Sequence, residues 1–322
     1  MNLSLDISAF ERPSQITEFV KGLKDRFLPL KFAYIGAAAY THDQLIKSPS
    51  YHLADIESTL IRDRFYEGII SKLGLTKKVL NFVDIGSGNG LKAITILEVL
   101  FNGKFSVNYL ALDYSQNLLD IVRKNIVNAF PDYNLMSTEV IDFENNPFAG
   151  VISKHIDNNA FSLFTLLGHT LGNPLDPKKA LANIRKSMID RNNCRFCLGV
   201  ELFESTKVEE MLANYRNDAF HKAVFTPLTF IGLSPQDGLL NIDFNYDTRN
   251  VEVFFVFSQD VSVNCHSLGF LDFKKGDRIL IFLSHRFSFD ILRQDLINAK
   301  FEIQTTIVGT STNYVLLLSA PV

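Results

Sequence analysis

Apolar residues follow two different spacings along the first two thirds of the chain. In one kind of segment they recur three and four positions apart, which predicts helices. These helical segments are residues 57–73, 91–101, 115–130 and 176–189. Between them lie short apolar runs, which predict strands. The strand-like runs are residues 78–86, 107–114, 161–168 and 194–202.

The two patterns alternate regularly, and polar residues stand where helices should begin. Ser115 precedes one helical segment and is well placed as its N-cap. Pro177 falls in the first turn of another, with Asp176 as the candidate cap. Alternation of strand and helix is typical of a parallel sheet covered by helices on both faces. The sequence therefore predicts an α/β fold with a doubly wound sheet.

The alternation stops after Glu201 and returns near the C-terminus. Residues 208–225 have helical spacing, whereas 225–259 consist of punctuated, strand-like runs. A helical segment then covers 289–301, and two strand-like runs at 302–309 and 312–320 are predicted to form an antiparallel pair at one edge of the sheet. We therefore expect two parts. Residues 57–202 plus 286–322 form the doubly wound domain, and residues 1–56 plus 203–285 form a second, smaller domain that acts as a lid over the substrate.

Composition and charge narrow the classes of function. The net charge of −3 and the pI near 6.2 argue against a nucleic-acid-binding protein. No run of eighteen apolar residues exists, which argues against a membrane partner. Cys194 and Cys197 form a CxxC inside a strand-like run, without a second pair of ligands, so we expect reduced core cysteines and no metal site. These cysteines and a start that lacks signal-peptide character favour a cytoplasmic location.

A glycine-rich turn follows the first strand-like run. Gly86, Gly88 and Gly90 stand at alternate positions in FVDIGSGNG, between a predicted strand and a predicted helix. Glycine lets a ligand approach the backbone closely, and the helix N-terminus offers free N–H groups. Asp113 ends the next strand, 23 residues after Gly90, where a carboxylate can accept both hydroxyls of a ribose. This arrangement predicts a site for a nucleotide-like ligand. The alternatives are a tight turn without a ligand and an acid that caps the following helix.

These segments resemble motifs of a known class of enzymes. VDIGSGNG, ALDYS and VIDFEN are similar to motifs I to III of the class I S-adenosylmethionine (SAM)-dependent methyltransferases. LPLKFAYIGAAAYTHDQLIKSPSYHLADIESTLI, LLGHTLGNPLDP, LGVELFES and LSHRF resemble the histidine-specific methyltransferase family, which makes trimethylhistidine for ergothioneine synthesis. The resemblance runs from about residue 28 to the C-terminus. It implies a class I methyltransferase Rossmann-like sheet with a smaller substrate-binding domain, and SAM as the cofactor.

The resemblance also implies which residues bind the cofactor and the amino-acid end of a substrate. The matching cofactor-binding positions are Gly86, Gly88, Gly90, Lys92, Asp113, Asp142, Phe143 and Gly168. Tyr51 and Asn173 match residues that hold the amino acid, and Tyr34 and Tyr215 match two further pocket tyrosines. Asn173 and Tyr51 would hold the carboxylate, and Tyr34 would orient the amine, which makes Tyr34 and Asn173 the catalytic candidates. Tyr34 and Tyr215 could equally be half-buried aromatics, and Asn173 a turn residue.

The chain departs from the family pattern at the far end of the substrate. Where the family reads the imidazole with a glutamate and a serine, this chain has Phe282 and Ser284, and Val253 replaces a methionine. A phenyl ring cannot accept the hydrogen bond of an imidazole N–H. We therefore expect methylation of the α-amine of an amino acid or related amine with an aromatic or apolar side chain. His285 should point away from this face of its strand, and His169 is a loop residue bonded to backbone in the simpler interpretation.

Three alternatives to that substrate remain open at this point. The chain could methylate the α-amine of histidine, act on another small molecule or a protein side chain, or bind the cofactor without catalysis. Turnover of SAM with a free amino acid would separate an amino-acid N-methyltransferase from a methyltransferase of another acceptor and from a cofactor-binding protein without catalysis.

Overall fold

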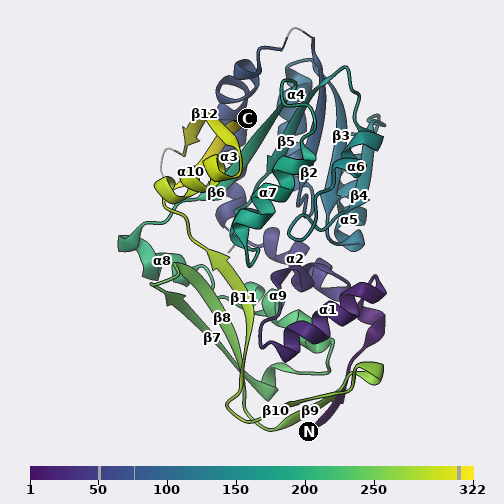
Figure 1. Ribbon diagram of the computed structural model, residues 1–322, viewed down its shortest axis with the longest axis vertical. Helices are drawn as coiled ribbons and strands as arrows, with labels where there is room; N and C mark the ends of the chain where they lie inside the picture. The colour runs from purple at the N-terminus through teal and green to yellow at the C-terminus, as the bar shows by residue number, and fades with distance from the viewer. Residues whose placement is uncertain (50–51, 76, 310–312) are drawn as a thin grey trace. The chain divides into compact units, whose positions relative to one another are not determined.

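The chain forms two compact units, shown in the computed structural model of Figure 1, which describes residues 1–49, 52–75, 77–309 and 313–322. Residues 52–204 and 287–322 make up the first, here called the α/β unit. Residues 1–51 and 205–286 make up the second, here called the smaller unit. The substrate-binding role expected for the smaller part stays a prediction.

A seven-stranded sheet forms the centre of the α/β unit. Its strand order is β12-β13-β6-β5-β2-β3-β4. The bounds are β2 Val79–Ile85, β3 Ser106–Asp113, β4 Met136–Val140, β5 Phe161–Leu166, β6 Cys194–Glu201, β12 Phe301–Val308 and β13 Tyr314–Pro321. The five strands β2 to β6 are parallel, and β13 runs antiparallel to both of its neighbours. The expected doubly wound sheet and the antiparallel edge pair are therefore confirmed.

The strand order of this sheet reverses at β2. That strand pairs with β3 on one side and with β5 on the other, so the chain winds outward in both directions from this point. In open α/β sheets, the crevice for a ligand lies outside the carboxyl ends of the strands at such a reversal. The glycine turn follows the carboxyl end of β2 directly, and this topology puts it where a ligand is expected.

Helices cover both faces of the sheet (Figure 1). One face packs against α3 His52–Gly68, α4 Leu91–Asn102 and α5 Gln116–Ala129. The other face packs against α6 Ala149–His155, α7 Pro177–Ser187 and α10 Phe289–Asn298. The predicted caps are present, since the Ser115 hydroxyl accepts the Leu118 N–H and the Asp176 carboxylate accepts the Lys179 N–H. Each cap satisfies a backbone donor that the first turn of a helix leaves without a partner.

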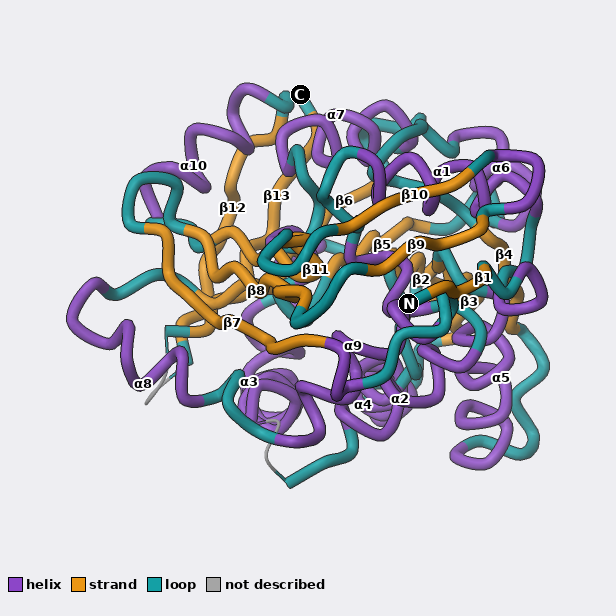
Figure 2. Tube along the Cα trace, turned by 90° about the horizontal axis from the view of Figure 1, so that it is seen from below, coloured by secondary structure: helices purple, strands orange, loops and turns teal. Residues whose placement is uncertain are grey.

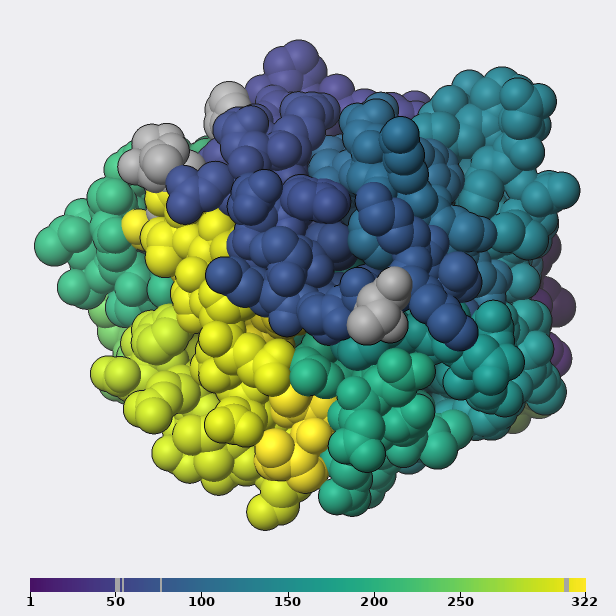
Figure 3. Space-filling view, turned by 90° about the horizontal axis from the view of Figure 1, so that it is seen from above, coloured from purple at the N-terminus to yellow at the C-terminus, as the bar shows by residue number. Residues whose placement is uncertain are grey.

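The C-terminal strands complete this unit beside its first helix. Gly68, at the end of α3, lies against the side chain of Ile307 on β12. Figure 3 shows the same proximity at the surface, where C-terminal residues in yellow adjoin the dark blue segment of α3. This unit is therefore not one continuous stretch of the chain. The last 36 residues, 287–322, supply the two strands at one edge of its sheet.

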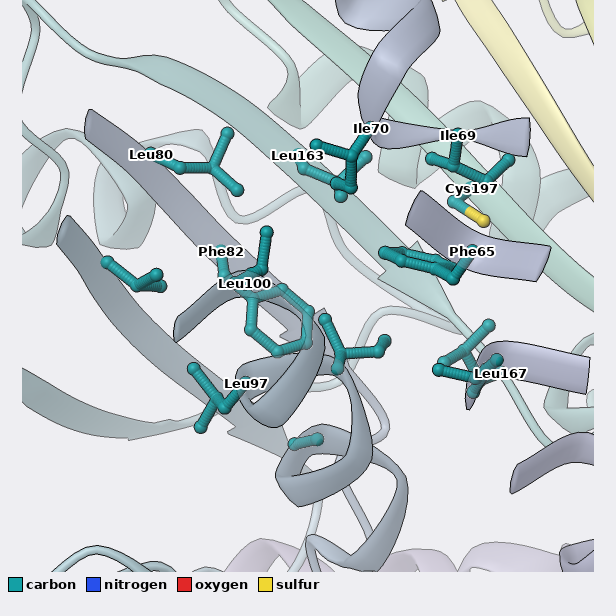
Figure 4. Close-up of a cluster of buried hydrophobic side chains, with 14 of the residues drawn as sticks. Phe65, Ile69, Ile70, Leu80, Phe82, Leu97, Leu100, Leu163, Leu167 and Cys197 are labelled. Atoms are coloured by element: carbon teal, nitrogen blue, oxygen red, sulfur yellow. The ribbon is translucent and has the colours of Figure 1, made fainter. Parts of the chain in front are cut away.

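The core between α3, α4 and the sheet is closely packed with large side chains. Phe65, Phe82, Leu97 and Leu163 belong to this cluster and are fully buried, and Figure 4 shows them together. Cys197 lies in the same cluster, where it behaves as a small apolar side chain. All three cysteines are free and buried, which fits the expected role in the core. Burial raises the pKa of the Cys194 thiol to about 12, so that it stays protonated near neutral pH.

The smaller unit contains two three-stranded sheets and several helices. One sheet has the order β11-β8-β7, formed by Arg278–His285, Asn250–Phe257 and Gly238–Asn245. The other has the order β1-β9-β10, formed by Asn2–Ser4, Val261–Asn264 and Phe270–Phe273. Both are orange in Figure 2. The helices are α1 Pro13–Lys24, α2 Ala37–Ile46, α8 Val208–Ala213 and α9 Asp218–Thr229.

The expectation for residues 208–229 was wrong in two respects. The single helix predicted over 208–225 is broken into α8 and α9, because Asn217 leaves the helical conformation and its side chain accepts the Phe220 N–H as a new N-cap. Asparagine competes for backbone donors in this way and favours helix starts over helix interiors. Helix α9 then continues through Pro227 to Thr229, where strand-like structure was expected. A short apolar run cannot be assigned to strand or helix by periodicity alone.

Candidate active site

The glycine turn after β2 has a backbone that only glycine adopts readily. Gly86, Gly88 and Gly90 have φ values of +63°, +57° and +78°. A Cβ at Gly86 would also lie 3.2 Å from the Thr170 methyl, and one at Gly90 would lie 3.1 Å from Val122. At Gly88 nothing lies within 4 Å of that position, so the turn is open there. The left-handed backbone thus favours glycine at all three positions. The space beside Gly88 is open to a ligand.

Asp113 connects the end of β3 to this turn. Its Oδ2 accepts the Gly88 N–H at 2.9 Å, and its Oδ1 accepts the Ser115 N–H at 3.1 Å. Burial raises the pKa of this carboxyl from 3.8 to about 6, although the backbone N–H groups oppose that change. The helix that follows is capped by the Ser115 hydroxyl rather than by Asp113. An ionised carboxylate accepts about four hydrogen bonds, so capacity remains for hydroxyl donors of a ligand.

Asp84, in the strand before the turn, is held inside the sheet. Its Oδ1 accepts the Thr165 hydroxyl at 2.8 Å, and its Oδ2 accepts the Tyr109 hydroxyl at 3.2 Å. These two partners lie on the neighbouring strands β5 and β3. Burial raises the pKa of the Asp84 carboxyl to about 6, and the nearby charge of Lys92 opposes the rise. Asp84 therefore links the three strands β2, β3 and β5 close to the residues of the turn.

Lys92 and Gly168, expected to bind the cofactor, lie together beside a buried carboxylate. The Lys92 Nζ is 3.5 Å from Glu57 Oε2, and Gly168 donates its N–H to Glu57 Oε1 at 3.0 Å. The Tyr314 hydroxyl donates to the same Oε1 and also accepts the Gly168 N–H at 3.1 Å. Burial, and then the charge of Glu57, raise the pKa of Tyr314 well above its ordinary value, which keeps it a donor. One network thus joins α3, α4, β13 and the loop after β5.

Glu57 and Tyr314 were not among the site residues predicted from the sequence. A signal for Glu57 was present, since it lies on the same helical face as Leu60, Ile61 and Phe65, which are all buried. A charged residue on an apolar face needs a partner, because an unpaired buried charge is costly. For Tyr314 no such signal existed, because a tyrosine in an apolar strand is an ordinary core residue.

Three further predicted positions of the α/β unit lie near the ends of β4 and β5. Asp142 follows β4, and its carboxylate accepts the backbone N–H of Asn145 at 3.2 Å and its side-chain amide at 2.9 Å. Phe143 is buried in the core cluster on the α7 face. Asn173 is half-buried at the end of a short 3₁₀ helix, Thr170–Gly172. Their roles toward a ligand stay predictions.

His169 begins that short 3₁₀ helix and is bonded to backbone, as the simpler interpretation of this residue held. Its Nδ1 accepts the Glu201 N–H at 3.1 Å, and its φ of +60° is left-handed. The ring therefore links the loop after β5 to the end of β6.

In the smaller unit, the positions expected to contact the substrate side chain cluster on one sheet. Phe282 on β11 lies opposite Val253 on β8, and Ser284 lies opposite Val251. Only 8% of Phe282 is exposed. Its ring centroid is 5.5 Å from that of Tyr215 and 5.1 Å from that of Phe220.

A buried arginine completes this cluster. Arg286 donates to the Tyr215 hydroxyl, and its guanidinium carbon lies 5.6 Å from the centre of the Tyr215 ring. Arg286, which follows the same strand as Phe282, was not among the predicted positions. Tyr215, Val253, Phe282 and Ser284 are thus neighbours within one unit, and Arg286 fixes the tyrosine among them.

Tyr34 is the other predicted site tyrosine in the described part of the chain, and it ends the 3₁₀ helix Leu30–Tyr34. Its ring packs edge-to-face against His42 of α2, with centroids 4.7 Å apart. Tyr51 lies outside the described residues.

Neither a metal-binding group nor a membrane-spanning helix is found in the part of the chain that the structure describes. Within residues 1–49, 52–75, 77–309 and 313–322, no group of three histidine, cysteine or acidic side chains is arranged to hold a metal ion. The helices in these ranges are all too short or too polar to cross a lipid bilayer.

A doubly wound sheet with a glycine turn and a strand-end acid at its reversal point defines a protein of the Rossmann-like, nucleotide-cofactor class. The sequence matches the model of the histidine-specific, SAM-dependent methyltransferase family over residues 16–320. The chain therefore belongs to this family and is a SAM-dependent methyltransferase, as the resemblance implied. No significant match was found among curated proteins.

Solved structures of methyltransferases are similar to this chain only at a distance. A SAM-dependent methyltransferase from Clostridium acetobutylicum is 15% identical, with 88% of this chain and 97% of that chain covered and a TM-score of 0.45. The SAM-bound amino pentose methyltransferase CalS10 from Micromonospora echinaspora is 14% identical, with 88% and 96% covered and a TM-score of 0.40. The dimethyltransferase RosA from Streptomyces davawensis is 12% identical, with 98% and 70% covered and a TM-score of 0.43. The family assignment rests on the family model and not on these structures.

Proposed function

We propose that this methyltransferase acts on the α-amine of an amino acid or related small amine whose side chain is aromatic or apolar rather than an imidazole. The observation that carries the proposal is the surroundings of Phe282. Its ring packs against the rings of Tyr215 and Phe220, which also contact each other, and Phe282 lies opposite Val253. A position that reads an imidazole in the family is thus part of an aromatic cluster here.

The α/β unit offers groups that fit each end of SAM. The open turn at Gly88 lets the cofactor approach the protein backbone closely. The Asp113 carboxylate has acceptor capacity for the ribose hydroxyls. Lys92, with a quarter of its side chain exposed, offers an ammonium to the methionine carboxylate. The buried Ser87 hydroxyl in the same turn has no hydrogen-bond partner among the described residues and could donate to the cofactor. We assign Asp142, Phe143 and the Gly168 backbone to the adenine and methionine ends by family resemblance.

The reacting end of the acceptor needs a deprotonated amine aligned with the donor. SAM, when bound, would supply a methyl group on a positively charged sulfur. The nitrogen lone pair of the acceptor would displace that sulfur in line and take the methyl group. The chain's own task is to fix the distance and direction of that nitrogen. We assign Asn173 and Tyr51 to the acceptor carboxylate and Tyr34 to the nitrogen. Among the described residues we assign no obligatory general base.

The far end of the acceptor decides the choice between histidine and other amino acids. Removing a charged partner of an imidazole N–H costs roughly 1.5–3 kcal/mol of affinity for histidine. An aromatic edge buried against Phe282 and Tyr215 gains a comparable amount, roughly 1.5–3 kcal/mol. Histidine should therefore fall behind phenylalanine, tyrosine or tryptophan. The specific observation favouring histidine as a second candidate is Ser284, which is kept at the family's serine position and is buried two residues from Phe282.

Mass spectrometry of reactions with free amino acids tests the proposal. Aromatic amino acids should gain one or more methyl groups on nitrogen with a higher kcat/KM than histidine. Phe282→Glu should raise the efficiency on histidine relative to the aromatic acceptors, whereas Phe282→Leu, which removes the ring without adding a charge, should not. Faster methylation of histidine by the unmodified protein would refute the interpretation of Phe282. Methylation only of another small molecule or of a protein side chain would replace the proposed acceptor class.

A further inference from the structure

Glu57 is a fully buried carboxylate whose two oxygens have different surroundings. Its side chain has no exposed surface, and Oε1 accepts from both Gly168 and Tyr314. Oε2 accepts no hydrogen bond from the described residues, and the Lys92 ammonium is 3.5 Å away from it. One oxygen is therefore anchored to backbone and hydroxyl donors, while the other faces the lysine.

Two glycines provide the space for this network. A Cβ at Gly168 would collide with the Lys92 Nζ, which passes directly over that residue. A Cβ at Gly199 on β6 would collide with the Tyr314 hydroxyl and would lie 2.9 Å from Glu57 Oε1. Since Gly199 has no left-handed φ, its lack of a side chain is explained by this close approach rather than by backbone conformation.

A buried ion pair of this kind is a poor device for stability. Removing two charges from water costs about as much as their attraction returns, and apolar side chains of similar size often serve as well. The pair therefore calls for a reason beyond stability. Lys92 is the exposed partner of this ion pair, with a quarter of its side chain exposed, and it lies in the first turn of the helix that follows the glycine turn. The network thus ends on a charge that a ligand can reach.

We infer that Glu57 is a positioning residue that holds the Lys92 ammonium over Gly168 for the methionine carboxylate of SAM. The inference rests on the proposed cofactor site. Glu57 touches no cofactor atom itself, because it is wholly buried. It acts by restricting a long, flexible side chain before binding, which lowers the ordering cost at the moment of binding. The result is an alternating series of protein carboxylate, ammonium and cofactor carboxylate.

Binding measurements with two ligands test this inference without any turnover. Calorimetry with SAM and with the same compound lacking its carboxylate gives the affinity ratio that the carboxylate contributes. The unmodified protein should prefer SAM. Glu57→Gln keeps the size of the side chain and an oxygen for Gly168, but it removes the charge. It should weaken SAM binding roughly tenfold and leave the affinity for the decarboxylated compound unchanged. Lys92→Met should abolish the preference.

Asp295→Asn is the matched control. Asp295 is also a buried carboxylate of the α/β unit with a lysine 3.6 Å away, but its partner Lys178 is 71% exposed and lies on α7. This substitution removes a buried charge without altering the Lys92 network. It should leave both affinities unchanged, which separates a local effect from general loosening of the fold.

The outcomes separate this inference from the proposed cofactor site. If the unmodified protein prefers SAM and Glu57→Gln keeps the same ratio, Glu57 does not position Lys92 for the carboxylate, while the cofactor site stands. If the unmodified protein has no preference for the carboxylate, the role of Lys92 fails together with the inference. Should Glu57→Gln not fold, Glu57→Asp keeps the charge but withdraws it by one methylene. A reduced ratio there supports the inference, and an unchanged ratio overturns it.

Discussion

The affinity for SAM should depend on pH through Asp113. Burial raises the pKa of its carboxyl to about 6, from 3.8. If the ionised carboxylate accepts the ribose hydroxyls, then protonation removes an acceptor and binding weakens as the pH falls through that value. Asp113→Asn is the matching perturbation, because it has nearly the same size and carries no charge at any pH.

The magnitude follows from the pKa. At pH 5, one unit below a pKa of about 6, roughly one carboxyl in eleven is ionised. If the protonated form binds poorly, the apparent affinity falls about tenfold, or about 1.4 kcal/mol. The fold should survive this change. A carboxyl whose pKa is higher in the folded than in the unfolded chain contributes stability that is fully present below pH 3.8 and is lost as the pH rises through about 6. Acidification to pH 5 therefore favours the folded state at this residue.

Calorimetric titration of SAM at constant ionic strength, from about pH 5 to about pH 7.5, measures the effect around a midpoint set by the raised pKa. Asp113→Asn should bind weakly and equally at every pH in this range. Asp84→Asn is the control, since burial raises the pKa of Asp84 to about 6 as well. The charge of Asp84 contributes a little to the raised pKa of Asp113, so this variant should keep the pH dependence and move its midpoint slightly lower. A profile that is flat in the unmodified protein, or one that disappears in Asp84→Asn, would refute the assignment to Asp113.

Three further predictions concern the network and the core. Lys92→Met should lower the free energy of unfolding by about 3 kcal/mol in urea titrations, because it leaves Glu57 buried without a counter-charge, and adding Glu57→Gln should restore more than half of the loss. An equal or larger loss in the double variant would contradict this account. Gly168→Ala combines a left-handed φ of +74° with a collision at Lys92, so it should weaken SAM binding at least tenfold while the protein stays folded by circular dichroism; unchanged affinity would show that the lysine can move aside at no cost. Cys194 and Cys197 should resist a thiol reagent in the native protein and react only on unfolding, because burial raises the pKa of both thiols; rapid native labelling would contradict their place in the core.

The sequence alone determined the parts of this protein that depend on local pattern. Short apolar runs and helices of period 3.6 are visible in consecutive residues, so β2, β3, β5 and β6 and the helices α4, α5 and α7 could be predicted. The short strand β4 and the helix α6 were not predicted, because neither has a long enough pattern of its own. The turn at Gly86, Gly88 and Gly90 and the acid at Asp113 could be predicted for the same reason, because a left-handed turn and a strand end have recognisable residues. The resemblance to a family added the cofactor, and the family model confirmed it.

The tertiary structure decided which residues far apart in the sequence contact one another and how deeply they are buried. Glu57 and Tyr314 are separated by 257 positions, and only the pairing of β13 with β6 brings the tyrosine hydroxyl to the carboxylate. The break between α8 and α9 depended on whether Asn217 would cap a helix or sit within one, which the neighbouring sequence left undecided. The raised pKa of Asp113 likewise comes from burial, which is a property of everything packed around it. Local periodicity fixes which face of an element is apolar, but the partner of a buried polar group depends on long-range packing that no short stretch of sequence encodes.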